Sequence, residues 1–383
     1  IRERVNKPET VDVLYANAGL TATGGHPSQL YGPARADQSY FVVDSVADFE
    51  RKWPQVLAGR PDFIKVYLEY SEDPKRNRGL KTELLRPIVE RAHAAKLTVS
   101  AHVASSADVH AAIAAGIDEI THLPLQPIDP ADAALAAKKK VAFVTTVLSH
   151  RETDGDPMPT HRANLALLKR AGVRVLLGVD NQPLVVDEAE AVRKLGVYDA
   201  RELLTMLVTT TPHAIFPKRR FARLEDGYEA SFLALDANPL EDFSAIRRIA
   251  LRVKQGHVLE IAPLKRSVAE ALMPAVMQGG AAAAIAEYKR LKAAEPDAWD
   301  YGEARVNQLG YALLQHDKVA DAIAIFRFNA ELFPQSANTW DSLGEAYLRA
   351  NDRAQAIANY RKSLELNPHN KNAEEALKKL EQP

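Results

Sequence analysis

Short apolar segments alternate with longer amphipathic ones along roughly the first 215 residues of the chain. Segments rich in apolar and β-branched residues predict six β-strands: Val11–Ala18, Phe63–Leu68, Leu97–His102, Ile117–His122, Val141–Val147 and Val173–Asp180. Stretches with helical spacing lie between them: Leu80–Ala95, Ser106–Ala115, Asp129–Lys139 and Thr160–Ala171. Strands that alternate with helices predict an α/β fold, in which helices cover a parallel sheet.

The number of strand–helix units decides whether such a sheet can close. A closed (β/α)₈ TIM barrel needs eight units, whereas the pattern predicts six strands. We therefore expect residues 1–217 to form a partial barrel whose first two units are missing, and the chain to be truncated at its N-terminus. An unclosed sheet of this kind leaves two strand edges without partners.

The pattern changes twice after this region. Residues 218–262 read as short strands separated by turns, and residues 263–383 are rich in Ala, Leu, Glu and Lys. The second composition is typical of helices. These changes predict three domains with boundaries near residues 217 and 262.

The helical region contains a repeated motif. One copy carries Trp340, Leu343, Gly344, Tyr347, Ala356, Tyr360 and Pro368. Another copy, 34 residues earlier (344 − 310), carries Leu309, Gly310, Leu313, Ala322, Phe326 and Pro334. A weaker third copy carries Ala284, Tyr288 and Pro296. The motif resembles the tetratricopeptide repeat, which implies stacked helical hairpins, and Lys371–Gln382 is suited to cap the stack.

Composition restricts the chemistry that is possible. The chain has no cysteine, which excludes disulfides, thiolate nucleophiles and cysteine-bound metals. The net charge is −1, and no cluster of basic and aromatic residues suggests nucleic-acid binding. We expect no apolar run to approach the length of a membrane-spanning helix. The compartment stays open between a bacterial cytoplasm and periplasm.

Four polar residues stand at or near the carboxyl ends of predicted strands: Lys65, His102, His122 and Asp180. Active sites of (β/α)₈ enzymes lie at that end, because the loops there converge. A single residue of this kind has ordinary explanations, such as an internal ion pair for Lys65 or a turn for Asp180. Together the four predict a functional site at this end of the strands, and in a chain without cysteine any metal must be held by His, Asp, Glu or a modified Lys.

The order Lys, His, His, Asp on the fourth, fifth, sixth and eighth strands, counted with the two missing units, resembles the metal site of the amidohydrolase superfamily, in its imidazolonepropionase- and prolidase-like branch. Gly24–Pro33 and Phe232–Leu251 also resemble segments of that branch. The resemblance implies that residues 218–262 add strands to a small β-sandwich. It implies hydrolysis of amide, peptide-like or cyclic amide C–N bonds, with a metal-bound hydroxide as nucleophile.

The resemblance also implies a role for each of the four residues. Lys65 would be carboxylated and bridge two divalent metals, with zinc as the expected metal. His102 and His122 would ligate the second metal. Asp180 would ligate the first metal and act as general base. The family's opening motif, two histidines separated by one residue, has no counterpart among the eleven histidines of this chain.

Four further residues are candidates for substrate contact. His26 and Tyr31 lie in the segment that resembles the family loop, Tyr67 follows Lys65 by two residues, and His150 follows the strand Val141–Val147. Packing within the loops explains His26, Tyr31 and His150 about equally well. Tyr67 lies on the same strand face as Lys65, because side chains alternate along a strand.

Two functions of different classes fit these observations. The first is the metal-dependent hydrolase, acting on a small-molecule or peptide-like substrate. The second is a catalytically inactive barrel that serves as a scaffold, in which the repeats bind a protein partner or mediate self-association. Retention of all four polar residues favours the hydrolase, since a scaffold has no need of them.

Overall fold

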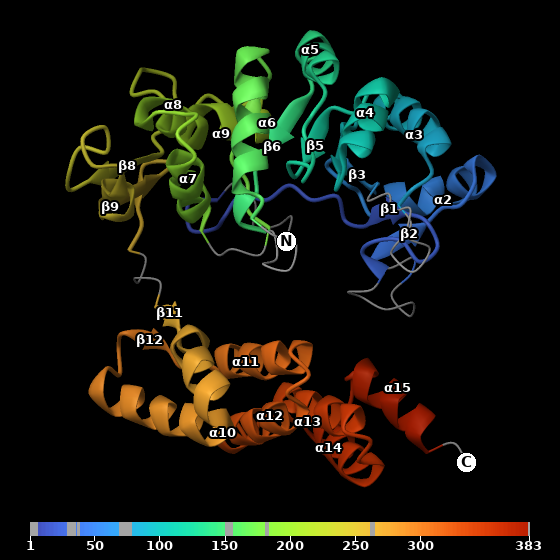
Figure 1. Ribbon diagram of the computed structural model, residues 1–383, viewed down its shortest axis with the longest axis vertical. Coiled ribbons are helices and arrows are strands. Elements are labelled where there is room, and N and C mark those ends of the chain that lie inside the picture. Colours follow the sequence, from blue (N-terminus) through green and yellow to red (C-terminus); the bar gives the residue numbers. More distant parts are fainter. Residues whose placement is uncertain are drawn as a thin grey trace. The chain divides into compact units, whose positions relative to one another are not determined.

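The computed structural model describes residues 7–28, 36, 39–68, 79–149, 156–180, 184–260 and 265–381 (Figure 1). The chain divides into two compact units, Ile1–Glu260 and Ile261–Pro383. Residues 218–260 group with the first unit, and the division after Glu260 lies close to the boundary predicted near residue 262.

The first unit contains a parallel sheet of seven strands, in the order β2-β1-β3-β4-β5-β6-β7. The strands are β1 (Gly19–Thr21), β2 (Tyr40–Val42), β3 (Ile64–Tyr67), β4 (Val99–His102), β5 (Glu119–Thr121), β6 (Ala142–Val144) and β7 (Val175–Leu176). Strands β2 and β7 form the two edges among the described residues. The α/β class with a parallel sheet is confirmed.

The start of the sheet differs from the prediction. The segment Val11–Ala18 is not a strand: Val11 is 80% exposed, and Asn17 takes a left-handed backbone that interrupts extended structure. The strand begins at Gly19 instead. Strand β2 was not predicted, because its apolar run is short and lies between loop-like segments. The described sheet therefore has seven strands where six were predicted.

Helices cover one face of this sheet. They are α2 (Val46–Ala58), α3 (Thr82–Ala94), α4 (Ser106–Ala115), α5 (Pro130–Lys139), α6 (Met158–Arg170) and α7 (Val185–Lys194). Figure 1 shows α3 to α7 following one another in an arc along the strands. The strand side chains that face them, such as Val66, Ala101 and Ile120, are fully buried in the main core. Burial of this face stabilises the unit, because it removes a large apolar area from water.

The first unit also contains short helices and a second, smaller sheet. It comprises the 3-10 helix η3 (Val147–Ser149), α8 (Ala200–Thr205), the π-helix η5 (Met206–Thr210), α9 (Thr211–Ile215) and the 3-10 helix η6 (Phe243–Arg247). A separate antiparallel sheet has the order β10-β9-β8, from β8 (Phe232–Leu235), β9 (Ile249–Lys254) and β10 (His257–Val258).

This small sheet lies where the chain was expected to add strands to a β-sandwich. Residues 218–260 form one three-stranded sheet among the described residues, and because a sandwich needs a second, facing sheet, the sandwich stays a prediction. Asp12 ties the start of the chain to this region: it pairs with Arg219 at 2.6 Å and with Lys254 at 3.1 Å. These long-range ion pairs bind the segment Val11–Ala18, which was predicted as a strand, to residues 219 and 254.

The second unit is helical. It contains the short strands β11 (Arg266–Ser267) and β12 (Trp299–Asp300), and the helices α10 (Val268–Ala294), α11 (Glu303–Gln315), α12 (Val319–Leu332), α13 (Ala337–Arg349), α14 (Arg353–Leu366) and α15 (Lys371–Leu380). Helix α10 is interrupted at Gly280, whose φ of +70° and ψ of −173° are not helical. The two stronger sequence repeats correspond to the pairs α11–α12 and α13–α14.

Helix α10 bears on one expectation from the sequence. Among the described residues it is the one helix long and apolar enough, by length and composition alone, to cross a membrane. Apart from this helix, which consists of two helices joined at Gly280, no described helix meets those criteria of length and composition. Its buried side chains, including Leu272, Val276 and Tyr288, belong to the core of the helical unit. The apolar composition thus has a structural explanation within the fold.

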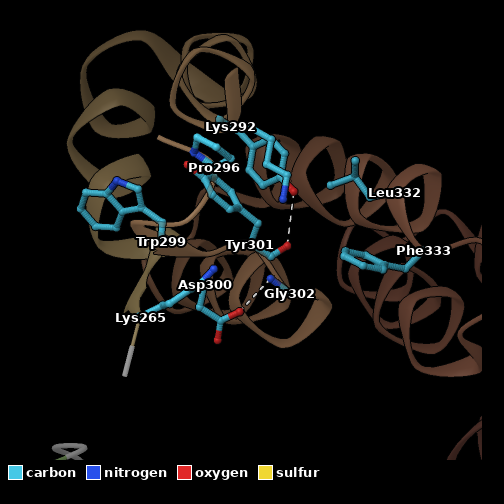
Figure 2. Close-up of a pocket in the computed structure, with 10 residues that line it drawn as sticks. Lys265, Lys292, Pro296, Trp299, Asp300, Tyr301, Gly302, Leu332 and Phe333 are labelled. Atoms are coloured by element: carbon cyan, nitrogen blue, oxygen red, sulfur yellow. Dashed lines mark hydrogen bonds between the residues drawn. The ribbon is translucent and has the colours of Figure 1, made fainter. Parts of the chain in front are cut away.

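A cavity of about 450 Å³ opens in the helical unit (Figure 2). Its walls include Tyr288, Trp299 and Tyr301, and Lys292 lies with its Nζ 4.3 Å from the centre of the Tyr301 ring. The Tyr288 hydroxyl donates to the Tyr301 carbonyl oxygen at 3.3 Å. Both contacts join residues that line the cavity, and none of the candidate catalytic residues in the described part of the chain lines it.

Candidate functional site

Polar side chains share the face of the parallel sheet opposite the helices α3 to α7. Residues Lys65 and Ser100 are register partners on β3 and β4, and Ser100 is in turn the partner of Glu119 on β5. One step further along the strands, Tyr67, His102 and Thr121 form the next row. Parallel register partners point to the same side of a sheet, so alternation along each strand sends apolar residues to the helices and polar residues to this face.

Three of the four ligand candidates lie in this part of the sheet. Lys65 is the second residue of β3, so it stands within the strand and not at its end. His102 is the last residue of β4, and His122 follows β5 directly. Asp180 lies four residues beyond β7, and its negative charge acts on both Lys65 and His26. The four predicted residues therefore share one electrostatic environment.

Aromatic and imidazole rings pack against one another at this place. The ring of His102 stacks on His26, with centroids 4.7 Å apart and planes inclined by 17°. It meets the His122 ring edge to face, with centroids 4.5 Å apart. Tyr67 lies 5.7 Å from His102 and 5.2 Å from His26. Of the predicted substrate contacts, His26 and Tyr67 thus join the cluster, whereas Tyr31 and His150 lie outside the described residues.

The position of Tyr67 depends on a glycine in the neighbouring strand. A Cβ atom at Gly19 of β1 would come within 2.4 Å of Tyr67 Cε2, a distance that atoms do not reach without displacement. Gly19 therefore leaves the space that the tyrosine ring occupies. The adjacent Thr21 is fully buried, and its Oγ1 has no hydrogen-bond partner among the residues that the structure describes. Such an orphaned hydroxyl on the polar face is typical of a site that receives a ligand.

Burial makes Lys65 unusual among the lysines. Desolvation lowers the pKa of its amine to about 8, although the negative charges of Glu119 and Asp180 act in the opposite direction. A neutral amine is thereby available close to neutral pH, which carboxylation by carbon dioxide requires. Glu119 was not identified from the sequence. Alternation from Ile120 would have placed it on the polar face, where its Oε1 accepts from Ser100 Oγ at 3.0 Å.

The imidazole of His102 stays neutral for the same physical reason. Burial lowers the pKa of His102 far below its usual range, and the positive charges of His122 and Lys65 lower it further. Burial also lowers the pKa of His26, against the influence of Asp180. A neutral imidazole keeps a lone pair on one ring nitrogen, and metal binding uses that lone pair.

His122 is held by a hydroxyl group on the next strand connection. Its Nδ1 lies 2.6 Å from Thr146 Oγ1, and both residues have a left-handed backbone, with φ of +77° and +74°. When Nδ1 carries the proton and donates to Thr146, the lone pair is on Nε2. This arrangement is typical of metal-binding histidines, whose second nitrogen is engaged by the protein.

The residues present fit a divalent cation bound by nitrogen and oxygen. The neutral imidazole of His102 lies edge to face with the His122 ring, and an amine of lowered pKa and a carboxylate act on the same space. Within the described ranges, no three His, Asp or Glu side chains are grouped closely enough to hold a metal by themselves. Lys65 would thus have to supply part of the coordination, since lysine becomes an oxygen ligand only once it is carboxylated.

Replacing Lys65 with methionine is expected to stabilise the metal-free protein in bicarbonate-free buffer. Between about pH 8 and 10.5 the unfolded chain holds a proton on Lys65 that the folded protein lacks, so wild-type stability rises with pH over this interval. The Lys65→Met variant does not bear the free-energy cost of burying a charged amine, which destabilises the folded wild type below about pH 8. That penalty is at most about 3 kcal/mol, because the lysine as a whole is only partly buried.

Urea denaturation from pH 7 to pH 10.5 tests this expectation. Trp53 is the sole tryptophan of the first unit, so its fluorescence in a background with Trp299 and Trp340 changed to phenylalanine reports on that unit alone. The advantage of Lys65→Met should be greatest at pH 7 and fade towards pH 10.5. Lys138→Met removes a charge at an exposed position and serves as control. An equal advantage at every pH would contradict the buried amine.

Comparison with known proteins identifies the family of the chain. The sequence profile of the amidohydrolase family matches residues 24–259. Ochratoxinase from Aspergillus niger is 28% identical over 275 aligned residues, which cover 62% of this chain and 57% of that protein. The chain thus spans somewhat more than half the length of the curated relative that it matches.

Solved structures share the fold. The crystal structure of A. niger ochratoxinase matches with a TM-score of 0.56 and 22% identity, over 66% of each chain. A prolidase complexed with N-methylphosphonate-L-proline matches with a TM-score of 0.52 and 20% identity, over 64% of this chain and 69% of that one. The family profile spans more than half of the residues and includes all four strand-associated candidates, and the chain belongs to the amidohydrolase family.

Proposed function

We propose that this protein is a metal-dependent hydrolase of amide, peptide-like or cyclic amide C–N bonds. The observation that carries the proposal is the meeting of His102, His122 and Lys65 on one polar face of the sheet, within the electrostatic reach of Asp180. Burial of the imidazole and amine groups is expensive unless they have a chemical use. Family membership supports hydrolysis, and the prolidase complexed with a phosphonate derivative of L-proline supports the class of bond.

The metal site would be formed by His102 and His122 through imidazole nitrogen and by Lys65 as a carbamate. Asp180 would complete the set with a carboxylate oxygen. This combination of donors suits zinc. When bound, a divalent metal would polarise the scissile carbonyl and lower the pKa of a water molecule. Whether one or two ions bind depends on ligands beyond these four, since the pair of histidines that opens the family motif has no counterpart in the chain.

The chain's own residues have separate tasks in this proposal. Asp180 accepts a proton from the attacking water on a carboxylate oxygen and passes it to the departing amine, which leaves as a neutral group. The Tyr67 hydroxyl and the His26 ring, which flank His102, contact the substrate next to the reacting carbonyl. His26 would present a ring nitrogen or the ring face that is not stacked on His102. These contacts orient the substrate and exclude water.

We extend the proposal to the architecture. The seven parallel strands are part of a (β/α)₈ barrel that further strands would complete, and the helical unit is a stack of tetratricopeptide repeats that binds a protein partner or a second copy of the chain. Two observations support the repeats: the helix pairs α11–α12 and α13–α14 follow the 34-residue period (344 − 310), and Gly310 and Gly344 each lie against an aromatic ring of the second helix in the pair.

Metal analysis combined with an activity screen tests the function. The protein is purified from cells grown with zinc and in bicarbonate-containing buffer, and metal is measured by mass spectrometry. We expect bound zinc and hydrolysis of N-acyl amino acids or Xaa-Pro dipeptides, both lost after chelation and restored by zinc. The chain is compared with any longer product that its gene encodes. Absence of stoichiometric metal and of hydrolysis in both would favour the inactive scaffold instead.

A further inference from the structure

Helix α7 carries a buried carboxylate that the proposed chemistry does not use. Glu188 of α7 is fully buried. Its Oε1 accepts the Val147 N–H at 2.7 Å, and its Oε2 accepts the Leu148 N–H at 3.2 Å. The Thr145 side chain and the Thr146 backbone also hydrogen-bond to it. Four consecutive residues after β6 therefore converge on a single carboxylate.

Such an arrangement is costly unless it serves a purpose. A buried carboxylate loses its hydration, and burial indeed raises the pKa of Glu188 against the effect of its hydrogen bonds. Among the ion pairs of the described residues, none involves Glu188, so only N–H and O–H dipoles compensate its charge. Those dipoles all come from residues 145–148, which comprise the connection after β6 and the first two residues of η3. The carboxylate thus fixes that connection in one conformation.

The connection it fixes carries the partner of His122. Thr146 is a buried, β-branched residue with φ of +74°, a backbone conformation that such residues rarely adopt without outside support. In this conformation Thr146 Oγ1 lies 2.6 Å from His122 Nδ1. The neighbouring Thr145 Oγ1 accepts the Gly178 N–H at 3.4 Å, two residues before Asp180. Glu188 is therefore linked through one hydrogen-bonded segment to the surroundings of both His122 and Asp180.

We propose that Glu188 and Thr146 are positioning residues for His122: the Glu188 carboxylate holds the segment 145–148 so that Thr146 Oγ1 accepts the Nδ1 proton and the lone pair of His122 stays on Nε2, facing the site. This inference rests on the proposed function only in one respect, namely that the lone pair on Nε2 binds a metal. The tautomer itself is a property of the metal-free protein and is measurable without any activity.

Two substitutions separate positioning from simple packing. Thr146→Val keeps the shape of the side chain and removes the acceptor, whereas Thr146→Ser keeps the acceptor and removes a methyl group. Glu188→Gln replaces one acceptor oxygen with an NH₂ group that would face backbone N–H donors. Asp132→Asn makes the same change of acid to amide at another buried carboxylate, which pairs with His110 at 2.9 Å, and serves as the matched control.

The first readout is the tautomer of His122 in the metal-free full chain, from two-bond proton–nitrogen correlations of ¹⁵N-labelled histidine at pH 8. We expect the Nδ1–H form in the wild type, Thr146→Ser and Asp132→Asn. We expect a shift towards the Nε2–H form in Thr146→Val and Glu188→Gln. An Nε2–H wild type, or a Thr146→Val variant with an unchanged tautomer, would overturn the proposal. Because Thr146→Val alters no buried charge, it tests the tautomer even if Glu188→Gln fails to fold.

The second readout is zinc affinity, measured by competition with a chromophoric chelator. Loss of a group that orients a metal-binding histidine weakens binding by about 10- to 100-fold. We expect that loss in Thr146→Val and Glu188→Gln, with near wild-type affinity in Thr146→Ser. A protein that binds no zinc but shows the predicted tautomers would refute the hydrolase while supporting the positioning role. Zinc binding of wild-type strength in Thr146→Val would contradict the positioning role and leave the hydrolase intact.

Discussion

Replacing Asp180 with asparagine is expected to lower kcat/KM by about 10²- to 10⁴-fold, the usual contribution of a positioned general base. Asparagine keeps the size of the side chain and an oxygen that can accept a hydrogen bond, but it cannot take a proton at neutral pH. His102, His122 and Lys65 are unchanged in this variant and asparagine keeps one oxygen donor, so zinc should still bind, with lower affinity than in the wild type. The loss should appear mainly in kcat, because the missing interaction acts in the transition state.

Measuring zinc content and rate on the same samples shows whether a lower rate of Asp180→Asn comes from the missing base or from missing metal. Steady-state kinetics on the best substrate of the screen, with zinc content measured on the same samples, separates loss of the base from loss of the metal. Asp226→Asn removes a carboxylate at an exposed loop position and should retain full activity. His102→Asn should lose both metal and rate. Retention of more than a tenth of wild-type activity by a zinc-loaded Asp180→Asn variant would rule out the role of Asp180 as base.

Replacing Phe326 with alanine is expected to lower the free energy of unfolding of the helical unit by about 3–5 kcal/mol, the range for large aromatic side chains removed from a core. Phe326 is fully buried on α12. A Cβ atom built on Gly310 of α11 would lie 2.5 Å from the ring carbon Cε1 of Phe326. The ring thus fills the space that the glycine leaves, and the two residues set the approach of the two helices.

A double-mutant cycle tests that contact directly. Gly310→Ala alone should cost about 1–3 kcal/mol through overpacking. In the Phe326→Ala background the clash is gone, and alanine should instead be neutral or stabilise by up to about 1 kcal/mol through its helix propensity. Hydrogen exchange of α11 and α12 peptides measures local stability in the full chain. Gly344→Ala, where the nearest ring atom of Tyr360 lies 3.0 Å away, should cost less. Strictly additive effects would show that Gly310 and Phe326 do not share one space.

The ligand candidates could be predicted from the sequence because the pattern that identifies each of them lies within a single short segment. A polar residue at the end of an apolar strand is visible in a single segment, and parallel strands bring their carboxyl ends to one edge. Lys65, His102 and His122 met on this basis, and Tyr67 followed from alternation along β3. Glu119 follows the same alternation, but it is the first residue of β5, and the search for polar residues at the carboxyl ends of strands therefore did not identify it.

The errors occurred where the pattern was weak or where distant residues decided the conformation. Strand β2 has three residues, too few for periodicity to distinguish it from a loop. The segment Val11–Ala18 has strand-like composition, yet the ion pairs of Asp12 with Arg219 and Lys254 hold it elsewhere. The length of α10 arises because two shorter helices meet at Gly280.

The sequence by itself determined the α/β class, the helical character of the C-terminal unit and the residue types that can serve a hydrolytic metal site. All of these follow from the local periodicity of side chains and from residue chemistry. The tertiary structure alone decided that Nδ1 of His122 meets Thr146 Oγ1, in a segment that is hydrogen-bonded to Glu188. The hydrogen bonds concerned join residues 24 and 41 positions apart. Contacts over such distances arise from the packing of α7 against the sheet, and no local pattern of side chains encodes them.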